Sequence, residues 1–453
     1  MPGAARRHKW DGMNKHLIAL PLIAVAVTGG AFLYLAQGDT SQLPPGADTG
    51  REPTITRPRS EMIPTINIAE VKPWTGGEQP VAAQGLSVAR FADGLAHPRA
   101  MLRLPNGDIL VAETNSPPRP KDGIVQRVMN YLMAKAGAGD PSANRITLLR
   151  DADGDGRAET KTPFLSGLNS PYGMALVGDT LYVANTDALM AFPYKPGDLK
   201  ISVAGRKILN LPAQAPNMHW TRSLAAGPDG LLYVGVGSNS NIGENGMETE
   251  TNRASVLEVN PKDGSYRIFA SGLRNPVGLA FEPTSGALWG VVNERDMLGA
   301  DLVPDYLTRV EFGGFYGWPW NYWGGYEDRR VQPQRPELRE YTKRPDYALG
   351  NHVAPLGLTF ADTVTLGAPY TDGAFVGLHG SWNRKPAAGY KVVFVGFADG
   401  EAGKAKPVDV LTGFLDADGN ARGRPVDVTA DAKGALLVSD DVGGVVWRVV
   451  KAN

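Results

Sequence analysis

One pattern recurs six times after residue 93, and it constrains the fold more than any other feature of the sequence. Each copy combines a short polar turn with Pro or Gly, an apolar strand, a Gly-containing turn, and a second strand that ends in a small or acidic residue. Their spacing is long enough for a four-stranded blade with insertions. The sequence therefore predicts an all-β domain, a six-bladed β-propeller over residues 85–453. The copies begin at Gly94, Gly167, Met218, Gly272, His352 and Arg422.

Strand-like runs between the copies account for the outer strands of each blade. Residues 86–92, LSVARFA, precede the first copy and alternate apolar and polar side chains, as a half-buried strand does. We expect them to pair with residues 444–450, GVVWRVV, at the other end of the domain. Such a pairing closes the ring and removes a free sheet edge.

Residues 1–36 have the pattern of a basic tail followed by a membrane segment. Lys and Arg residues precede an uncharged, largely apolar stretch, residues 17–36. At a rise of ~1.5 Å per residue, this stretch is long enough to cross the ~30 Å hydrocarbon layer as a helix, and the preceding positive charge keeps the N-terminus inside. The sequence thus predicts an anchored protein on the periplasmic side of the inner membrane. A cleaved signal peptide and a buried soluble helix are the alternatives.

Residues 37–84 separate this segment from the first repeat. They are rich in Pro, Gly, Thr and Ser and have little periodic apolar pattern. Such a composition is typical of a linker, and the alternative is a segment draped on the domain.

Composition excludes several classes of function. The formal net charge is −1 and the pI is about 6.6, which disfavours nucleic acid as a partner. The chain has no cysteine, so it lacks disulfides, thiolate metal sites and a cysteine nucleophile. No G-x-G-x-x-G turn joins a strand to a helix, which disfavours NAD.

Equivalent loops of different blades converge on the axis of a propeller, so residues at the starts of different repeats become neighbours. Arginines that face one another there repel, and a ligand with several carboxylates or phosphates would balance them. The residues expected to converge are His219, Arg274 with Asn275, Arg384, and Arg422 with Arg424. In the alternative interpretation, these arginines pair with the nearby acids Glu294, Asp296 and Asp427.

Several motifs separated along the chain occur in a distinctive order. They are HWTRSLAAGPDG, GLRNPVGLAF, NERDMLGADLVPDY, GGFYGWPWNY, HGSWNR and GRPVDV. Together they resemble one known family, the glucose and sorbosone dehydrogenases that depend on pyrroloquinoline quinone (PQQ), and within it the sorbosone-dehydrogenase-like branch. The resemblance covers about residue 85 to the end of the chain. It implies a quinoprotein that oxidises an aldose or aldehyde sugar by hydride transfer to PQQ and passes electrons to a respiratory acceptor.

The resemblance also implies roles for individual residues. His219 matches the catalytic base, and an imidazole has a useful neutral fraction near neutral pH. Arg274 and Asn275 match the pair that contacts the quinone and stabilises the charge developing there. The arginines that match those holding the carboxylates of the cofactor are Arg422 and Arg424. Where the glucose-oxidising members have a cofactor-binding lysine, this chain offers Arg384 or Lys385.

Two acidic stretches are candidate Ca²⁺ sites because hard oxygen donors suit this ion. The first, NERDMLGAD, offers Asn293, Glu294, Asp296 and Asp301, although it lacks the Gly-Pro step of the glucose-oxidising members. Its alternative is a salt-bridge network with Arg295 and Arg274. The second, DADGDGRAET, resembles the first half of an EF-hand loop, and its alternative is a solvated acidic turn. Its candidate ligands are Asp151, Asp153, Asp155 and Glu159.

Two other classes of function remain compatible with a propeller. A calcium-dependent hydrolase of the lactonase kind would use central acids and metal-activated water, and a non-catalytic propeller would bind a glycan or a protein without turnover. The arginine set favours an anionic cofactor over both.

Overall fold

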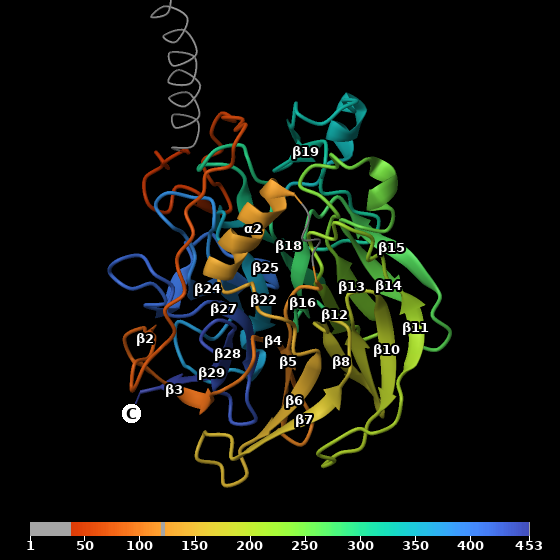
Figure 1. The fold of residues 1–453 in the computed structure, drawn as a ribbon, viewed down its shortest axis with the longest axis vertical. Helices are drawn as coiled ribbons and strands as arrows, with labels where there is room; N and C mark the ends of the chain where they lie inside the picture. The colour runs from red at the N-terminus through yellow and green to blue at the C-terminus, as the bar shows by residue number, and fades with distance from the viewer. Residues whose placement is uncertain (1–37, 119–122, 453) are drawn as a thin grey trace, which may run out of the picture.

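The computed structural model describes residues 38–118 and 123–452 and confirms the six-bladed propeller (Figure 1). Each blade has four antiparallel strands, counted outward from the axis. The innermost strands are β4 (Pro98–Arg103), β8 (Met174–Val177), β12 (Arg222–Ala226), β16 (Pro276–Phe281), β22 (Pro355–Phe360) and β27 (Pro425–Ala430). The second strands are β5 (Ile109–Glu113), β9 (Thr180–Ala184), β13 (Leu232–Val236), β17 (Leu288–Val292), β23 (Gly373–Leu378) and β28 (Leu436–Asp440).

The third strands are β6 (Arg145–Arg150), β10 (Ala188–Pro193), β14 (Ser255–Val259), β18 (Pro304–Arg309), β24 (Lys391–Ala398) and β29 (Val445–Lys451). The outer strands are β7 (Thr160–Ser166), β11 (Arg206–Asn210), β15 (Tyr266–Ser271), β21 (Tyr347–Asn351), β26 (Val408–Thr412) and β3 (Leu86–Ala92). Smaller elements decorate the blades: β1 (Thr49–Gly50), β2 (Val81–Ala82), β19 (Asn321–Tyr322), β20 (Tyr326–Glu327), β25 (Glu401–Ala402), the helix α2 (Ile124–Lys135), and 3₁₀ turns at Met247–Glu250, Pro336–Tyr341 and Ala361–Thr363.

Burial of the strands follows their place in the blade. Second strands such as β13, LYVGV, are buried along their whole length, because neighbouring blades cover both faces. Outer strands such as β3 alternate between partly buried and exposed residues. The hydrophobic core therefore lies between the blades. Trp289 of β17, for example, packs edge-on against Phe397 of β24, with ring centroids 4.9 Å apart.

The ring closes through its two ends, as the sequence predicts. Strand β3 pairs antiparallel with β29, so the sixth blade contains both the first and the last long strand of the propeller. Arg90 lies opposite Trp447, and its guanidinium carbon is 5.1 Å from the centre of the indole ring. A cation over an aromatic face adds to the stability of this closing pair.

Residues 38–84, here called the strap, lie on the propeller and join its sheets at two points. Thr49 and Gly50 form β1 and extend the fourth blade at β21, and Val81 and Ala82 form β2 and extend the fifth blade at β26. Between them, Trp74 packs against the sixth blade. The strap is thus draped on the domain.

No helix in residues 38–118 and 123–452 is both long and apolar enough to cross a bilayer. The predicted membrane segment, residues 17–36, lies outside the described residues.

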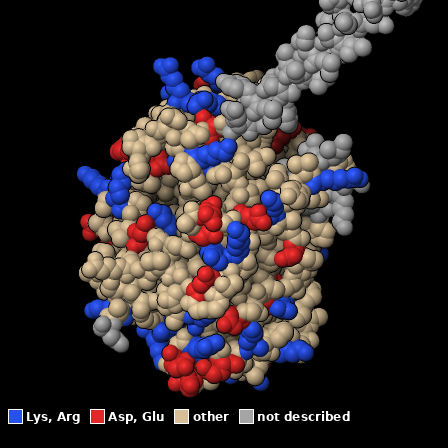
Figure 2. Space-filling model, turned by 60° about the vertical axis from the view of Figure 1, so that its left-hand side comes forward, with Lys and Arg blue, Asp and Glu red and all other residues tan. Residues whose placement is uncertain are grey.

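The two ends of the propeller differ in what they present. Inner strands begin and second strands end at one rim, here called the mouth, which is uppermost in Figure 1. The turn between β6 and β7 lies at the opposite, lower end. Figure 2 shows Lys and Arg mixed with Asp and Glu over one face of the molecule, and the densest acidic group lies at that lower end. A central cavity of about 400 Å³ runs between the inner strands of all six blades.

Candidate active site

His219 lies at the mouth, three residues before β12. Its Nδ1 is 2.8 Å from the backbone oxygen of Ser238 and 3.0 Å from the Oγ of the same residue. Because a carbonyl oxygen can only accept a hydrogen bond, Nδ1 carries the proton and Nε2 keeps its lone pair. Burial and the positive charge of Arg274 lower the pKa of His219 to about 3. The ring is therefore neutral at physiological pH.

Arg274 precedes β16 and is almost fully buried. Its Nε donates to the backbone oxygen of Asn241 at 3.1 Å, and its Nη1 donates to the backbone oxygen of Glu294 at 2.6 Å. Its Nη2 donates to Asn241 Oδ1 at 2.9 Å and to Asp296 Oδ2 at 3.1 Å. The protein itself thus supplies acceptors to all three guanidinium nitrogens. Arg274 brings a fixed positive charge to His219.

Asp296 joins three parts of this network. Its Oδ1 accepts from Asn383 at 2.8 Å and lies 3.6 Å from the Nδ1 of His352. Burial alone would raise the pKa of Asp296, but Arg274, His352 and Asn383 hold it well below its usual range. The sequence did not identify His352, Asn383 or Asn241 as site residues, because their role is to orient Arg274 and Asp296 from other loops.

Asn275, next to Arg274, is also buried. Its backbone oxygen accepts from the amide of Asn293, and its Oδ1 has no partner among the described residues. A buried amide oxygen without a donor is unfavourable, so this atom marks a point where a ligand or water with an N–H or O–H group would be stabilised.

The acids of the first candidate calcium stretch are held apart. Asp296 binds Arg274, whereas Glu294 Oε2 accepts from the Nε of Arg295 at 3.0 Å. Asp301 accepts from the Oγ of Ser41 in the strap at 2.5 Å. The three carboxylates therefore have different partners in this structure, and each takes part in an ion pair or a hydrogen bond.

Arg384 and Lys385 follow β23 and contact the strap. The Nη2 of Arg384 donates to the Oγ of Ser41 at 2.9 Å, and it lies 3.5 Å from an oxygen of Asp48 and 3.8 Å from one of Asp301. The backbone oxygen of Lys385 accepts from the amide of Ser41 at 2.7 Å. Acids thus already balance the charge of Arg384.

Arg422 and Arg424, two residues apart, have different surroundings. The Nη1 of Arg422 is 3.3 Å from Oε2 of Glu78 in the strap. Arg424 is buried, donates to the hydroxyl of Tyr390 at 3.1 Å and lies over the Tyr390 ring at 5.1 Å. Both arginines precede β27, which begins at Pro425, and only Arg424 is buried.

Asp427, the third acid of the alternative interpretation, pairs with none of these arginines in the described structure. It lies in β27 and lines the central cavity. Its carboxylate accepts from the backbone amides of Met101 and Val428. Burial outweighs these bonds and raises the pKa of Asp427 to about 7. The acid links the sixth blade to the first.

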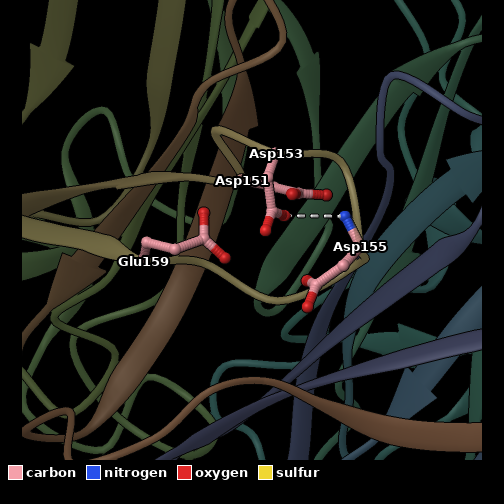
Figure 3. A group of neighbouring side chains, drawn as sticks. All are labelled: Asp151, Asp153, Asp155 and Glu159. Carbon is pink, nitrogen blue, oxygen red and sulfur yellow. Dashed lines mark hydrogen bonds between the residues drawn. The ribbon is translucent and has the colours of Figure 1, made fainter.

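The second candidate calcium stretch forms the turn between β6 and β7, far from the mouth (Figures 1 and 3). Ligand oxygens of Asp151, Asp153, Asp155 and Glu159 all lie within 4.8 Å of one another. Backbone amides satisfy some of these oxygens, as when Gly154 donates to Asp151 at 2.7 Å. The structure thus brings together the four residues that the sequence selected.

The fold and the residues at the mouth together define the class of protein. It is a six-bladed propeller with histidines and buried arginines around the entrance to its central channel. Within that class, the chain belongs to the TrAA12-like family, which it matches over residues 80–304 and 335–452.

Solved structures with low sequence identity share this fold. The holo form of the PQQ domain of pyranose dehydrogenase from Coprinopsis cinerea has a TM-score of 0.66, with 22% identity over 85% of this chain and 100% of that one. A calcium structure of the family AA12 protein from Trichoderma reesei has a TM-score of 0.65, with 19% identity over 83% of this chain and 100% of that one.

Curated relatives are similar over part of the sequence. The PQQ-dependent pyranose dehydrogenase of Coprinopsis cinerea is 28% identical over 297 residues, and the aldose sugar dehydrogenase of Escherichia coli is 26% identical over 163 residues. These matches cover 52% and 33% of this chain. They span only 40% and 42% of the relatives' own lengths.

Proposed function

We propose that the protein is a quinoprotein oxidoreductase that oxidises an aldose or aldehyde sugar, of the sorbosone kind, with PQQ as the hydride acceptor. Membership of the TrAA12-like family and the PQQ-dependent sugar dehydrogenases among its relatives support this proposal. One observation on the chain itself carries the proposal: among the described residues, the buried Arg424 has no carboxylate partner.

Arg424 is a buried cation without a carboxylate partner among the described residues. Its side chain contacts Tyr390, and its Nε is buried with no hydrogen-bond acceptor. An unpaired charge in a desolvated position is costly, and an anion bound at the mouth would remove that cost. PQQ carries several carboxylates, which fit a guanidinium group well.

The residues at the mouth therefore fit the cofactor, with Arg424 as its principal anchor. The unpartnered oxygen of Asn275 would accept a hydrogen bond from it. Arg274 would act on the quinone through its fixed charge. Arg384, Lys385 and Arg422 would border the cofactor on the side of the strap, where Asp48 and Asp301 balance the charge of Arg384.

His219 is proposed as the base. Its neutral ring would accept the proton of the sugar hydroxyl at Nε2, while the bond from Nδ1 to Ser238 holds its orientation. When bound, PQQ supplies the group that accepts the hydride. Arg274 opposes protonation of His219, so an anionic ligand beside Arg274 would make the imidazole a stronger base.

Ca²⁺ is proposed to assist in two places. At the mouth, carbonyl and carboxylate oxygens of residues 293–301 would bind it beside the cofactor. In the turn of Figure 3, the four carboxylates would bind it as a structural ion. For the whole chain, we propose residence on the periplasmic side of the inner membrane, anchored by residues 17–36 or released by cleavage, with a respiratory electron acceptor.

The experiment is reconstitution of the full chain in detergent with PQQ and Ca²⁺. Dye reduction across a panel of aldoses and sorbosone reports activity, and quenching of protein fluorescence reports PQQ binding. We expect Arg424→Gln to weaken PQQ binding about 10- to 100-fold, the loss for a charged hydrogen bond of ~1.5–3 kcal/mol. Arg422→Gln is the matched control with a much smaller effect. If the wild-type chain neither binds PQQ nor reduces dye, the hydrolase or binding class replaces this proposal.

A further inference from the structure

A second histidine at the mouth is held by a carboxylate. His379 follows β23 of the fifth blade, and Asp441 follows β28 of the sixth. The Nε2 of His379 is 3.0 Å from Asp441 Oδ2, and the same oxygen accepts from the Nη1 of Arg99 at 2.6 Å. Arg99 is the second residue of β4, so three blades contribute to the cluster.

The cluster is buried yet not closed. The side chains of Asp441, Arg99 and His379 are 4%, 12% and 17% exposed. Burial would raise the pKa of Asp441, but His379 and Arg99 hold it well below its usual range. Asp441 is therefore ionised and accepts a hydrogen bond from the N–H at Nε2 of His379. The neutral ring then has its lone pair on Nδ1. Among the described residues, the structure gives that nitrogen no partner.

The same mouth carries both imidazoles. The guanidinium carbon of Arg99 lies 5.8 Å from the ring of Tyr172 and 5.7 Å from the ring of Trp220, the residue next to His219. Two aromatic side chains and one arginine thus connect the His379 cluster to the proposed base across the opening.

The charges around the two histidines differ. Burial lowers the pKa of His379, Asp441 acts in the opposite direction, and Arg424 and Arg99 lower it further. His219 has a carbonyl and a hydroxyl on its Nδ1, whereas His379 has a carboxylate on its Nε2. A carboxylate stabilises the imidazolium ion that forms when the ring accepts a proton.

Oxidation of a sugar releases its two protons at two different stages. Conversion of a C–H and an O–H bond into a carbonyl releases two electrons and two protons. The hydroxyl proton leaves first, and the hydrogen that travels as hydride becomes a proton only when the electrons pass to an acceptor, such as two molecules of ferricyanide.

We infer that His379, held by Asp441 and Arg99, accepts this second proton at Nδ1, while His219 accepts the first. The inference rests on the proposed function. It divides the two halves of the reaction between two histidines on different blades, and Asp441 balances the positive charge that His379 acquires.

Stopped-flow measurement of the full chain loaded with PQQ and Ca²⁺ separates the two halves. In His379→Gln, we expect reduction by the sugar to stay within about threefold of wild type, and re-oxidation by ferricyanide to slow by about 100-fold, the usual size of one general acid–base group. In His219→Gln, we expect the opposite result: reduction by the sugar slows by about 100-fold, and re-oxidation by ferricyanide stays within about threefold of wild type. His97→Gln is the control, because its imidazole pairs with the exposed Asp140 at 3.5 Å and acts on Asp441 only through its charge. Its effect on re-oxidation should therefore be much smaller than that of His379→Gln.

A second readout needs no cofactor. Nitrogen NMR of histidine-labelled protein reports the ring tautomer, and we expect His379 to be protonated at Nε2 in wild type and to lose this preference in Asp441→Asn. Unchanged re-oxidation in a folded His379→Gln variant overturns the inference while the proposed function stands. Failure of the wild-type chain to be reduced by any sugar overturns the proposed function itself.

Discussion

Trp74 is one of several residues that fix the strap to the propeller, and Trp74→Phe isolates one hydrogen bond of this contact. The Nε1 of Trp74 donates to Asp440 Oδ2 at 2.7 Å. Its ring packs edge-on against Trp447 and Phe414, with centroids 5.5 and 5.8 Å apart. Phenylalanine keeps an aromatic ring at this position and removes the N–H donor.

The expected loss follows from the partners of Asp440. This buried carboxylate also accepts from the Nε1 of Trp447 at 3.1 Å and from the amides of Arg424 and Gly443. Loss of one hydrogen bond to a charged acceptor lowers the free energy of unfolding by ~1.5–3 kcal/mol. We expect the lower end, about 1.5 kcal/mol, because Asp440 keeps three other donors. Trp74→Ala also loses two ring contacts of ~0.5–1.5 kcal/mol each, for a total of about 3 kcal/mol.

The loss should depend on pH. Burial raises the pKa of Asp440 to about 6, with Trp74 the main opposing influence. A carboxyl whose pKa is higher in the folded state stabilises the protein at pH values below its unfolded-state pKa. This stability is lost as the pH rises through its folded-state pKa. Trp74→Phe raises the folded pKa further, so its deficit should be largest above about pH 6 and shrink towards pH 4.

Guanidinium unfolding followed by circular dichroism measures both effects. Trp320→Phe is the control, because its indole donates to the backbone oxygen of Pro333 at an exposed position. A Trp74→Phe variant within about 0.5 kcal/mol of wild type at pH 7.5, or one whose deficit grows as pH falls, would refute the reasoning.

Two further predictions concern the mouth and the acidic turn. Arg274→Gln removes the charge that lowers the pKa of His219, so the pKa should rise from about 3 towards its ordinary value, as read from an NMR titration of the ring; an unchanged value would assign the shift to burial alone. Ca²⁺ should raise the melting temperature of wild type more than that of a variant carrying Asp153→Asn and Asp155→Asn, with Asp416→Asn as control. An equal response of all three proteins would place the ion elsewhere.

Sequence repeats were sufficient to predict the blades and their closure. Six copies of one pattern specify six sheets, and the alternation in residues 86–92 marks a strand that needs a partner. The turn at residues 151–159 was also found from sequence, because its four acids lie close together in the chain and a tight turn gathers them.

The partners of the arginines could not be predicted in the same way. Ser41, Asp48 and Glu78 reach Arg384 and Arg422 from the strap, and nothing in the local sequence of either arginine indicates such contacts. The cluster around His379 needs three blades in register. The only sequence signal for this cluster was the HGSWNR motif. That motif pointed to Arg384, its last residue, rather than to His379, its first.

The closing pair also has a consequence for biosynthesis. Strand β3 is made early, but its partner β29 follows more than 350 positions later in the chain. At ~5–20 residues per second, β3 waits about 20–70 s on the ribosome for its neighbour. The first five blades can form one after another from hairpins, whereas the sixth is assembled only after β29 has been made. Loss of β29, Val445–Lys451, would thus leave the propeller with two open sheet edges, a template for aggregation.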